Sequence, residues 1–300
     1  MPPESEYPLQ SLTAARVVVV AGKGGVGKTT VTAVIARAAS DAGQRVLVVE
    51  LDGKPTLADL LRDAPDVTVM PISAPDALDE YLRDHGFARI AKRLNRTGVI
   101  DMVGTAAPGI DDVVVLGKIK QLERSGDWDL VVVDGPAAGH AITFLTSAAG
   151  LADAVRAGPV RAQADDVLEL LHDGDRCQVV LVALPETTPV NEVIETAFAL
   201  EDLVGVQLGP LVVNGVDTEA PLPDPEEESA VLADVPDDEA LTLAEAAAFR
   251  RSRREMERHE LERLATELPL PQIRLTARPV AGLTADDIGA MASELTGEVS

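Results

Sequence analysis

The chain has 300 residues, a formal net charge of -24 and a single cysteine, Cys177. This acidity argues against binding to nucleic acid, which requires clustered Lys and Arg, and against electrostatic attachment to anionic membranes. One cysteine excludes an intrachain disulfide framework, a four-cysteine zinc site and an iron–sulfur cluster held by the thiolates of one chain.

The composition also indicates the kind of core. Hydrophobic residues make up 46% of the chain but aromatic residues only 2%, so the core must consist of Val, Leu, Ile and Ala, as in parallel α/β sheets. No stretch is long and apolar enough to span a bilayer, and the acidic, proline-rich residues 1–6 are unlike a signal peptide. We therefore expect a cytoplasmic protein without an integral membrane segment.

The first predicted elements are a strand and a helix that flank a glycine-rich loop. Residues 16–21 are apolar and β-branched, which indicates a buried parallel strand, and residues 30–42 form a helix that Gly43 ends. The segment between them fits G-x-x-x-x-G-K-[ST], the phosphate-binding loop. It consists of Gly22, Lys23, Gly24, Gly25, Val26, Gly27, Lys28 and Thr29. A simple glycine turn is the alternative, but strand, spacing, lysine, hydroxyl and helix all agree with the phosphate loop.

The residue types of this loop match the chemistry of polyphosphate. Glycines let the backbone wrap closely, so that successive N–H groups point at the phosphate oxygens, and the helix N-terminus adds its positive dipole end. Lys28 would neutralise the β- and γ-phosphates, and the Thr29 hydroxyl would bind Mg²⁺. Thr30 is within reach of the α-phosphate. The loop also carries a second lysine, Lys23.

Strands and helices continue to alternate, which predicts an α/β fold with a doubly wound, mostly parallel sheet and helices on both faces. Further strands are expected at residues 45–51, 67–70, 130–134, 179–184 and 210–214, and helices at 77–94, 112–124, 140–157, 164–172, 190–204 and 239–268. We expect a flexible N-terminus over residues 1–15 and a single P-loop domain over residues 16–300. Helical insertions are expected at about 72–126 and 150–173, and a solvated acidic linker, or less simply a functional acidic segment, at 215–238.

Polar residues follow three of the predicted strands, and ligands of open α/β sheets bind at such strand ends. Asp134 precedes a glycine and suits an acid that holds Mg²⁺ through water, with a turn-forming Asp as the alternative. Asp52 lies where a loop can fold over the γ-phosphate and orient the attacking water, with an Asp-Gly turn as the alternative. Asn214 ends a third strand. His140 has no metal-ligand spacing and is interpreted as part of a switch loop.

Together these residues resemble the ArsA and guided-entry (tail-anchored protein targeting) ATPase family, in the deviant Walker A class with MinD, ParA and nitrogenase iron protein. Residues 22–30 match the loop of the class throughout. Residues 134–145 are similar to the family's switch II segment, and residues 107–112 and 184–187 to two further family stretches. The resemblance implies a P-loop ATPase that uses ATP and Mg²⁺.

The resemblance also implies roles for single residues. Lys23 is implied to reach across a dimer interface to the partner's phosphates, and Asp52 to activate water in switch I. The adenine is implied to hydrogen-bond Asn214 and to be covered by a terminal loop. That loop contains Leu275, Thr276 and Ala277. The implied catalytic residues are thus Lys23, Lys28 and Asp52, and the implied Mg²⁺ site is Thr29 with Asp134, partly through water.

Several features depart from the family pattern. Glu50-Leu51 stands where the family has Ser-Thr, and residues 53–55 replace its Pro-Ala-His. The chain also lacks the Cys-x-x-Cys pair that binds an intersubunit zinc, the methionine-rich client helix and the several cysteines that bind arsenite. What remains is a short bacterial-type member, of the kind labelled anion-transporting ATPase, whose protein client the sequence does not identify.

The leading hypothesis is a Mg²⁺-ATP-driven switch that forms a homodimer or a heterodimer with a sister ATPase. Its helices at 77–124 and 152–172 would hold or release a client, although the apolar stripe in the second region is predicted to be core. That stripe comprises Ala162, Val167, Leu168, Leu170 and Leu171. One alternative is a weakly active or inactive scaffold subunit of a heterodimer. Another is a MinD- or ParA-like positioning ATPase, which the acidic residues 284–287 disfavour.

Overall fold

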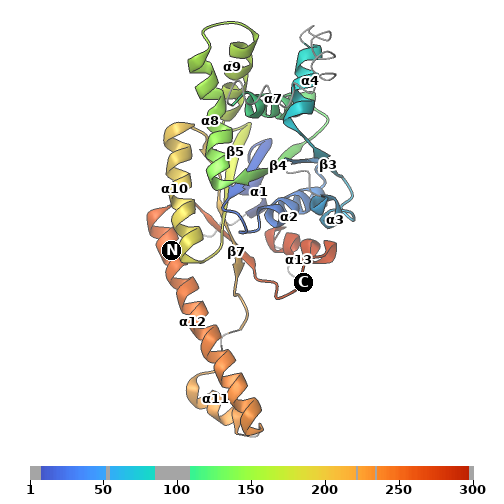
Figure 1. Cartoon of the computed structure of the whole chain (residues 1–300). Coiled ribbons are helices and arrows are strands. Elements are labelled where there is room, and N and C mark those ends of the chain that lie inside the picture. The colour runs from blue at the N-terminus through green and yellow to red at the C-terminus, as the bar shows by residue number, and fades with distance from the viewer. Residues whose placement is uncertain (1–7, 52–54, 85–108, 221, 234, 297–300) are drawn as a thin grey trace.

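The computed structural model describes residues 8–51, 55–84, 109–220, 222–233 and 235–296. These residues form an eight-stranded sheet with the order β3-β2-β4-β1-β5-β7-β8, and β6 lies beside β5 (Figure 1). All of its strand pairings are parallel. The strands are β1 Val17–Gly22, β2 Val46–Glu50, β3 Val67–Pro71, β4 Leu130–Ala137, β5 Cys177–Ala183, β6 Gln207–Leu208, β7 Leu211–Val216 and β8 Gln272–Thr276.

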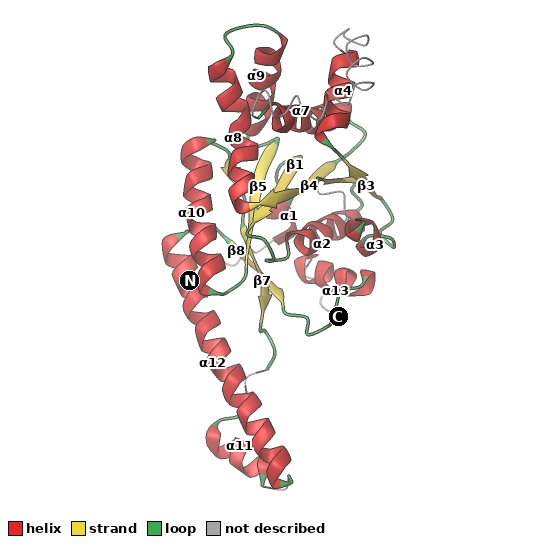
Figure 2. Cartoon of the chain, viewed as in Figure 1, coloured by secondary structure: helices red, strands yellow, loops and turns green. Residues whose placement is uncertain are grey.

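Helices cover both faces of this sheet (Figure 2). One apolar cluster joins one face to α1, α2, α3 and α13, and a second joins the other face to α4, α7, α8, α9, α10 and α12. The helices are α1 Pro8–Leu12, α2 Lys28–Asp41, α3 Thr56–Leu60, α4 Ala74–Asp84, α7 Ile110–Ser125, α8 Ala138–Ala154, α9 Pro159–Leu171, α10 Thr187–Leu203, α11 Pro225–Leu232, α12 Asp237–Glu267 and α13 Ala285–Thr296. This layered arrangement confirms the predicted doubly wound α/β fold.

The central strand β1 shows why the strands have continuous apolar runs. Val17 and Val19 point into the cluster beneath α8 and α10, whereas Val18 and Val20 point into the cluster beneath α2. A strand that is buried on both faces has no solvent side and therefore no polar alternation. Because all pairings are parallel, the carboxyl ends of the strands gather at one edge of the sheet, and the loops that follow them meet there.

The N-terminal segment is packed in part, contrary to prediction. Helix α1 places Leu12 fully inside the core, and the side-chain amide of Gln178 donates a hydrogen bond to the Leu12 carbonyl at 2.7 Å. The prediction of a flexible segment over residues 1–15 is therefore wrong for residues 8–15, because a single short turn of helix leaves no periodic pattern in the sequence. Residues 1–7 lie outside the described residues.

The segment predicted as an acidic linker over residues 215–238 contains a helix, α11. A side-chain oxygen of Asp224 accepts a hydrogen bond from the backbone N–H of Glu227 at 2.9 Å, and Pro225 occupies the first helical position. Both are features of a capped helix start, so the prolines and carboxylates that suggested a loop instead begin a helix. The loop prediction is therefore wrong for residues 225–232.

Helix α12 is 31 residues long and runs past the body of the protein, with α11 beside its outer half (Figure 1). At the other end of the molecule lies a helical region of α4, α7, α8 and α9 (Figure 1). Helices α4 and α7 fall within the insertion predicted at about 72–126 and α9 within the one at 150–173, whereas most of α8 lies between the two. Of the apolar stripe predicted to be core, Val167, Leu170 and Leu171 are buried and Leu168 is partly buried. Ala162 is exposed, so the prediction is wrong for that residue. Part of the first insertion, residues 85–108, lies outside the described residues.

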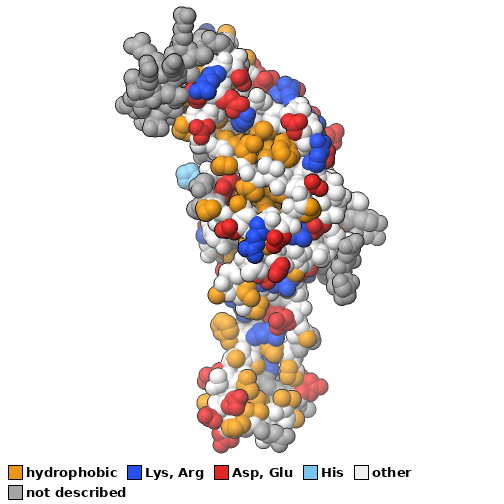
Figure 3. Space-filling view, turned by 90° about the vertical axis from the view of Figure 1, so that its right-hand side faces the viewer, with side chains coloured by type: hydrophobic (Ala, Val, Ile, Leu, Met, Phe, Trp, Pro, Cys, Tyr) orange, Lys and Arg blue, Asp and Glu red, His pale blue; other side chains and the backbone are white. Residues whose placement is uncertain are grey.

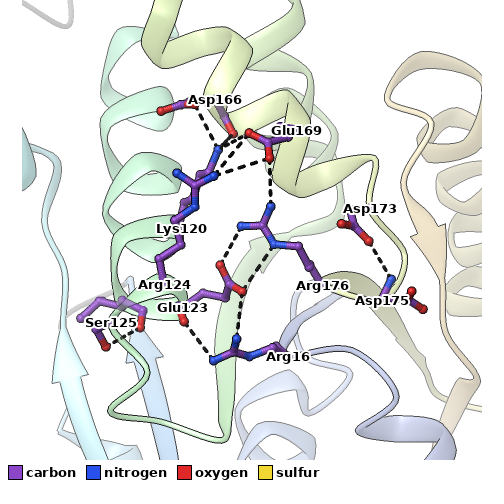
Figure 4. Close-up of polar contacts among 11 residues, drawn as sticks. Arg16, Lys120, Glu123, Arg124, Ser125, Asp166, Glu169, Asp173, Asp175 and Arg176 are labelled. Atoms are coloured by element: carbon purple, nitrogen blue, oxygen red, sulfur yellow. Dashed lines mark hydrogen bonds and ion pairs between the residues drawn. The ribbon is translucent and has the colours of Figure 1, made fainter.

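A network of charges around the buried Glu123 and Lys120 ties this helical region to the starts of β1 and β5 (Figure 4). Glu123, 3% exposed, accepts a hydrogen bond from Arg176 at 2.7 Å and pairs with Arg16 at 3.5 Å. The nearly buried Lys120 bonds Glu169 of α9 at 3.0 Å. Leaving either buried charge without a partner is costly, so these contacts help to hold α7 against α9 and against the starts of the strands. The network lies at the amino ends of the strands, opposite the edge where ligands bind.

Among the helices within the described ranges, none combines the length and the apolar character that a bilayer-crossing segment requires.

Candidate functional site

The phosphate loop joins β1 to α2, and close approach of the backbone explains two of its glycines. A Cβ atom on Gly22 would overlap the carbonyl oxygen of Val182 on the neighbouring strand β5. Gly27, which begins α2, has a φ of 91°, and a Cβ atom there would overlap the amide of Asn214. Only glycine fits either position, so the loop can curl tightly at the end of the central strand. The result is a concave backbone directly before a helix N-terminus, which is suited to an anion.

The lysine that the motif assigns to phosphate binding folds back over this loop. The Nζ atom of Lys28 donates a hydrogen bond to the carbonyl oxygen of Lys23 at 3.2 Å. The amine therefore lies beside the backbone at the start of the loop. From this place a small movement would bring the positive charge onto phosphate oxygens cradled by the loop.

The two residues predicted to hold Mg²⁺ are in direct contact. The Thr29 hydroxyl donates to one carboxylate oxygen of Asp134 at 2.8 Å, and Thr32 donates to the other at 3.3 Å. Thr29 comes from the first turn of α2 and Asp134 from the carboxyl-terminal half of β4, so the neighbouring strands β1 and β4 bring them together. Hydroxyl and carboxylate oxygens are the hard ligands that Mg²⁺ prefers, so this pair fits the ion chemically.

A second carboxylate lies at the same edge of the sheet. Glu50, only 7% exposed, is the last residue of β2 and is in register with Asp134 on the adjacent strand β4. Paired residues of parallel strands point to the same face, so both carboxylates lie on the side of α2. The described residues contain no cluster of three or more His, Cys, Asp or Glu that would hold a metal unaided.

The predicted adenine residues lie on the next strands of the sheet. The Asn214 side-chain amide donates to the carbonyl of Val26 at 2.9 Å, so this strand end touches the phosphate loop. The Leu275 side chain is buried in the core, which leaves only its backbone for a ligand. The Thr276 hydroxyl bonds Glu294 at 3.1 Å, and the Ala277 N–H bonds the carbonyl of Val216 at 2.9 Å. Leu275, Thr276 and Ala277 therefore lie beside the end of β7, whose last residue, Val216, comes two positions after Asn214.

The second lysine of the loop forms an ion pair that the sequence did not predict. The Nζ atom of Lys23 lies 2.5 Å from a carboxylate oxygen of Glu192 on α10. Both side chains are partly open to solvent, with exposed fractions of 35% and 38%. The two residues are 169 positions apart, so no local pattern could have revealed the pair. Thr32, by contrast, could have been found, because it lies three residues after Thr29 on the same face of α2.

The predicted switch residues are described only in part. Asp52, predicted to position water, lies outside the described residues, as does the start of the 107–112 stretch. Asp112 of that stretch lies in the first turn of α7. Burial raises the pKa of its carboxyl above the ordinary value, and repulsion from Asp111 raises it further, whereas His140 lowers it. His140 therefore lies near enough to α7 to interact electrostatically with it, at the start of α8.

A cleft of about 1350 Å³ lies away from the phosphate loop, between α12, β8 and the segment after β7. Its walls include Leu222, Leu261 and Pro269, together with several arginines and glutamates of α12. No residue of the phosphate loop lines it. It therefore belongs to the projecting helices rather than to the site at the strand ends.

Comparison with known proteins agrees with this geometry. Residues 15–157, which contain the phosphate loop and Asp134, match a family model described as "Anion-transporting ATPase". The chain is 34% identical over 227 residues to "ATPase BagA" of Mycobacterium tuberculosis, a match that covers 68% of this chain and 66% of the relative. The chain belongs to the anion-transporting ATPase family. It is also 29% identical over 212 residues to the "Arsenical pump-driving ATPase" of Escherichia coli.

Membership of the anion-transporting ATPase family confirms the resemblance found in the sequence. The matched segments span just under two thirds of the mycobacterial relative and 36% of the Escherichia coli protein. What those longer proteins do as a whole therefore does not carry over directly. The specific roles of Lys23, Asp52 and Asn214 remain predictions.

Proposed function

We propose that this chain is a Mg²⁺-dependent ATP hydrolase that acts as a nucleotide-driven dimeric switch for a protein client. The observation that carries the proposal is the contact between Thr29 and Asp134 beneath the phosphate loop, 2.8 Å long. This contact brings together a hydroxyl and a carboxylate, the two groups with which a P-loop ATPase would hold its metal. Family membership supports an ATPase, and the loop geometry supports binding of a polyphosphate.

The loop residues would divide the binding of ATP between them. Backbone N–H groups of the glycine-rich turn and the N-terminus of α2 would cradle the phosphates. Lys28 would leave the carbonyl of Lys23 and neutralise the β- and γ-phosphates, and Asn214 and residues 275–277 would face the adenine. Bound Mg²⁺ would neutralise charge on the phosphates. Thr29 would hold the ion directly, and Asp134 would hold it through water.

Hydrolysis would depend on one switch residue and on the second lysine of the phosphate loop. Asp52 would orient and activate the attacking water, and Lys23 of a second chain would stabilise charge on the leaving phosphates. After release of phosphate, the segment that begins at Asp134 would relax and alter the position of α8. The helical region would thereby hold or release a client. The second chain would be another copy or a sister ATPase.

The test is phosphate release by the purified protein with Mg²⁺ and ATP, alongside the Asp52→Asn variant. We expect slow turnover by the wild type, and ATP binding without turnover by the variant. Unchanged turnover in Asp52→Asn would remove Asp52 from the mechanism. Tight binding of ATP by the wild type without any turnover would favour a scaffold subunit that requires a sister ATPase. Failure to bind ATP at all would overturn the proposal.

A further inference from the structure

The α11–α12 arm, residues 222–253, is the part of the molecule that the proposed function leaves unexplained. The inner half of α12 buries Glu257, Glu260 and Leu264 against the body, and its Glu260 accepts a hydrogen bond from Thr187 of α10 at 2.8 Å. The outer half of α12 extends beyond the body with α11 beside it (Figure 1). It adds nothing to the core around the sheet.

Ion pairs fix the base of the arm. Arg250 of α12 makes a two-pronged contact with Asp217, which follows β7, at 2.7 and 2.8 Å. Arg251 donates to the carbonyl oxygen of Pro223 at 3.2 Å. A paired guanidinium and carboxylate hold both position and orientation, so the outer half of α12 projects in a defined direction. A rigid surface loses little conformational entropy when it binds a partner.

The arm exposes large apolar side chains in one region. Val231, Leu241, Leu243 and Phe249 have exposed fractions of 67%, 62%, 47% and 70%. Single exposed apolar residues are ordinary, but a group of them on one projecting element is typical of an interaction site. Figure 3 shows apolar side chains gathered at the end of the arm, with acidic ones among them. Exposure of a phenylalanine is notable because the chain has only four.

The charge on the outer part of the arm, residues 222–249, is of one sign, and the arginines of the arm lie at its base. Residues 222–249 contain no Lys, Arg or His. Their acidic residues are Asp224, Glu226, Glu227, Glu228, Asp234, Asp237, Asp238, Glu239 and Glu245. Those of them that the structure describes, such as Asp224, Asp237 and Asp238, are exposed. An apolar surface with carboxylates nearby is complementary to a segment with apolar and basic faces, because contact area supplies affinity and opposite charge supplies orientation and association rate.

We propose that the α11–α12 arm is a docking surface for a basic amphipathic helix of a partner protein. The negative charge of the arm disfavours three other partners that an apolar surface could bind: a second copy of this chain, an anionic membrane and nucleic acid. Two arms from two copies of this chain would bring like charges together, and anionic lipid or nucleic acid would be repelled in the same way. A helix with apolar residues at i, i+3, i+4 and i+7 and with Lys or Arg on its flanks satisfies both features of the arm. This role goes beyond ATP hydrolysis and does not depend on it.

The probe is a fluorescent peptide of about 18 residues in which Leu forms one helical face and Lys the other. Its binding to the full chain is measured by fluorescence anisotropy at about 0.15 M salt. The test variant is Leu241→Ser with Phe249→Ser, which removes apolar surface and leaves every charge. The matched control is Phe198→Ser with Leu203→Ser, which alters two apolar side chains on α10 that are 49% and 61% exposed.

We expect the peptide to bind the wild type and the control alike, and the arm variant about tenfold more weakly or worse. A peptide with Glu in place of Lys is expected not to bind. Binding of the peptide by the arm variant as tightly as by the wild type would overturn the proposal. The net negative charge of the chain, and not the apolar surface of the arm, would then explain the binding. If the double variant unfolds, Phe249→Ser alone gives the same comparison.

Two further measurements separate the competing occupants. Sedimentation of the wild type that shows self-association, abolished in Leu241→Ser with Phe249→Ser, would assign the arm to a second copy and overturn the proposal. Binding to neutral phosphatidylcholine vesicles that is lost in the same variant would assign it to lipid and would also overturn it. We expect neither.

Discussion

Lys23 of the phosphate loop and Glu192 of α10 form an ion pair within one chain, with Nζ and the carboxylate oxygen 2.5 Å apart. An amine held in this way is turned toward its own chain and cannot at the same moment reach phosphates bound by another. Because both side chains are more than one third exposed, the pair stabilises this arrangement by only about 0.2–1 kcal/mol. The contact is therefore weak enough for phosphate groups to displace it.

Glu192→Gln is predicted to strengthen nucleotide-dependent association of two chains. In the wild type, each protomer must break the Lys23–Glu192 pair, at a cost of about 0.2–1 kcal/mol, before Lys23 can reach the other chain. Glu192→Gln removes this cost from both protomers, so a symmetric dimer would form about 2- to 30-fold more tightly. Sedimentation velocity with Mg²⁺ and a non-hydrolysable ATP analogue measures this. The control is Glu195→Gln, at an exposed position one turn further along α10. Weaker association in Glu192→Gln than in the control would mean that Glu192 supports the dimer instead.

Lys28→Ala is predicted to weaken ATP binding about 10- to 100-fold, because it removes a charged hydrogen bond worth about 1.5–3 kcal/mol. Titration with a fluorescent ATP analogue gives the affinity. Lys118→Ala is the matched control, since Lys118 pairs with Glu80 at 2.5 Å in the helical region, away from the loop. Similar affinities for both variants would remove the phosphate-binding role of Lys28.

Asp134→Asn is predicted to reduce the contribution of Mg²⁺ to ATP binding. The amide retains the shape of the side chain but loses the negative charge that attracts the cation, so affinity with Mg²⁺ falls about tenfold while affinity in EDTA stays the same. Calorimetry with and without Mg²⁺ measures both values. Asp129→Asn, just before the same strand, is the control. An equal loss of affinity with and without Mg²⁺ would indicate damage to the loop instead.

Acid is predicted to loosen the base of the α11–α12 arm. The hydrogen bond from Arg250 lowers the pKa of Asp217 below its ordinary value of 3.8. A carboxyl whose folded-state pKa is lowered stabilises the protein above its unfolded pKa, and this stabilisation is lost as pH falls through the folded pKa. Asp217→Asn should therefore lower the free energy of unfolding by about 1 kcal/mol at neutral pH and by less at acid pH, where the Asp217 carboxyl of the folded wild type becomes protonated.

Urea unfolding of the wild type and Asp217→Asn across this range of pH measures the effect of the Asp217 carboxyl. Asp63→Asn, at an exposed site outside the arm, is the control and should change stability little at any pH. A difference between wild type and Asp217→Asn that stays constant from neutral to acid pH would contradict the assignment.

The thiol of Cys177 is predicted to be unreactive in the folded protein. Cys177 begins β5 inside the core, and burial raises its pKa to about 12, so the nucleophilic thiolate is scarcely populated near neutral pH. Reaction with a disulfide reagent at about pH 8 should be slow in buffer and rapid in denaturant. Rapid modification under native conditions would mean that the start of β5 opens readily.

The sequence predicted those parts of the fold that follow local patterns. The apolar runs of β1 and β4 and the glycine spacing of the phosphate loop depend on neighbouring residues, and Thr29 and Asp134 follow from them. Leu12 of α1 and the capped start of α11 at Asp224 were missed because each helix is short and surrounded by turn-forming residues. The Lys23–Glu192 pair and the register of Glu50 with Asp134 depend on the three-dimensional arrangement of the sheet, which no local pattern reveals.

Sedimentation of the wild type and Lys23→Ala with Mg²⁺ and the non-hydrolysable analogue shows whether ATP joins two chains through Lys23. Nucleotide binding is measured on the same samples. We expect the wild type to double in mass, and Lys23→Ala to bind nucleotide but stay a single chain. Association of Lys23→Ala as tight as that of the wild type would contradict this expectation.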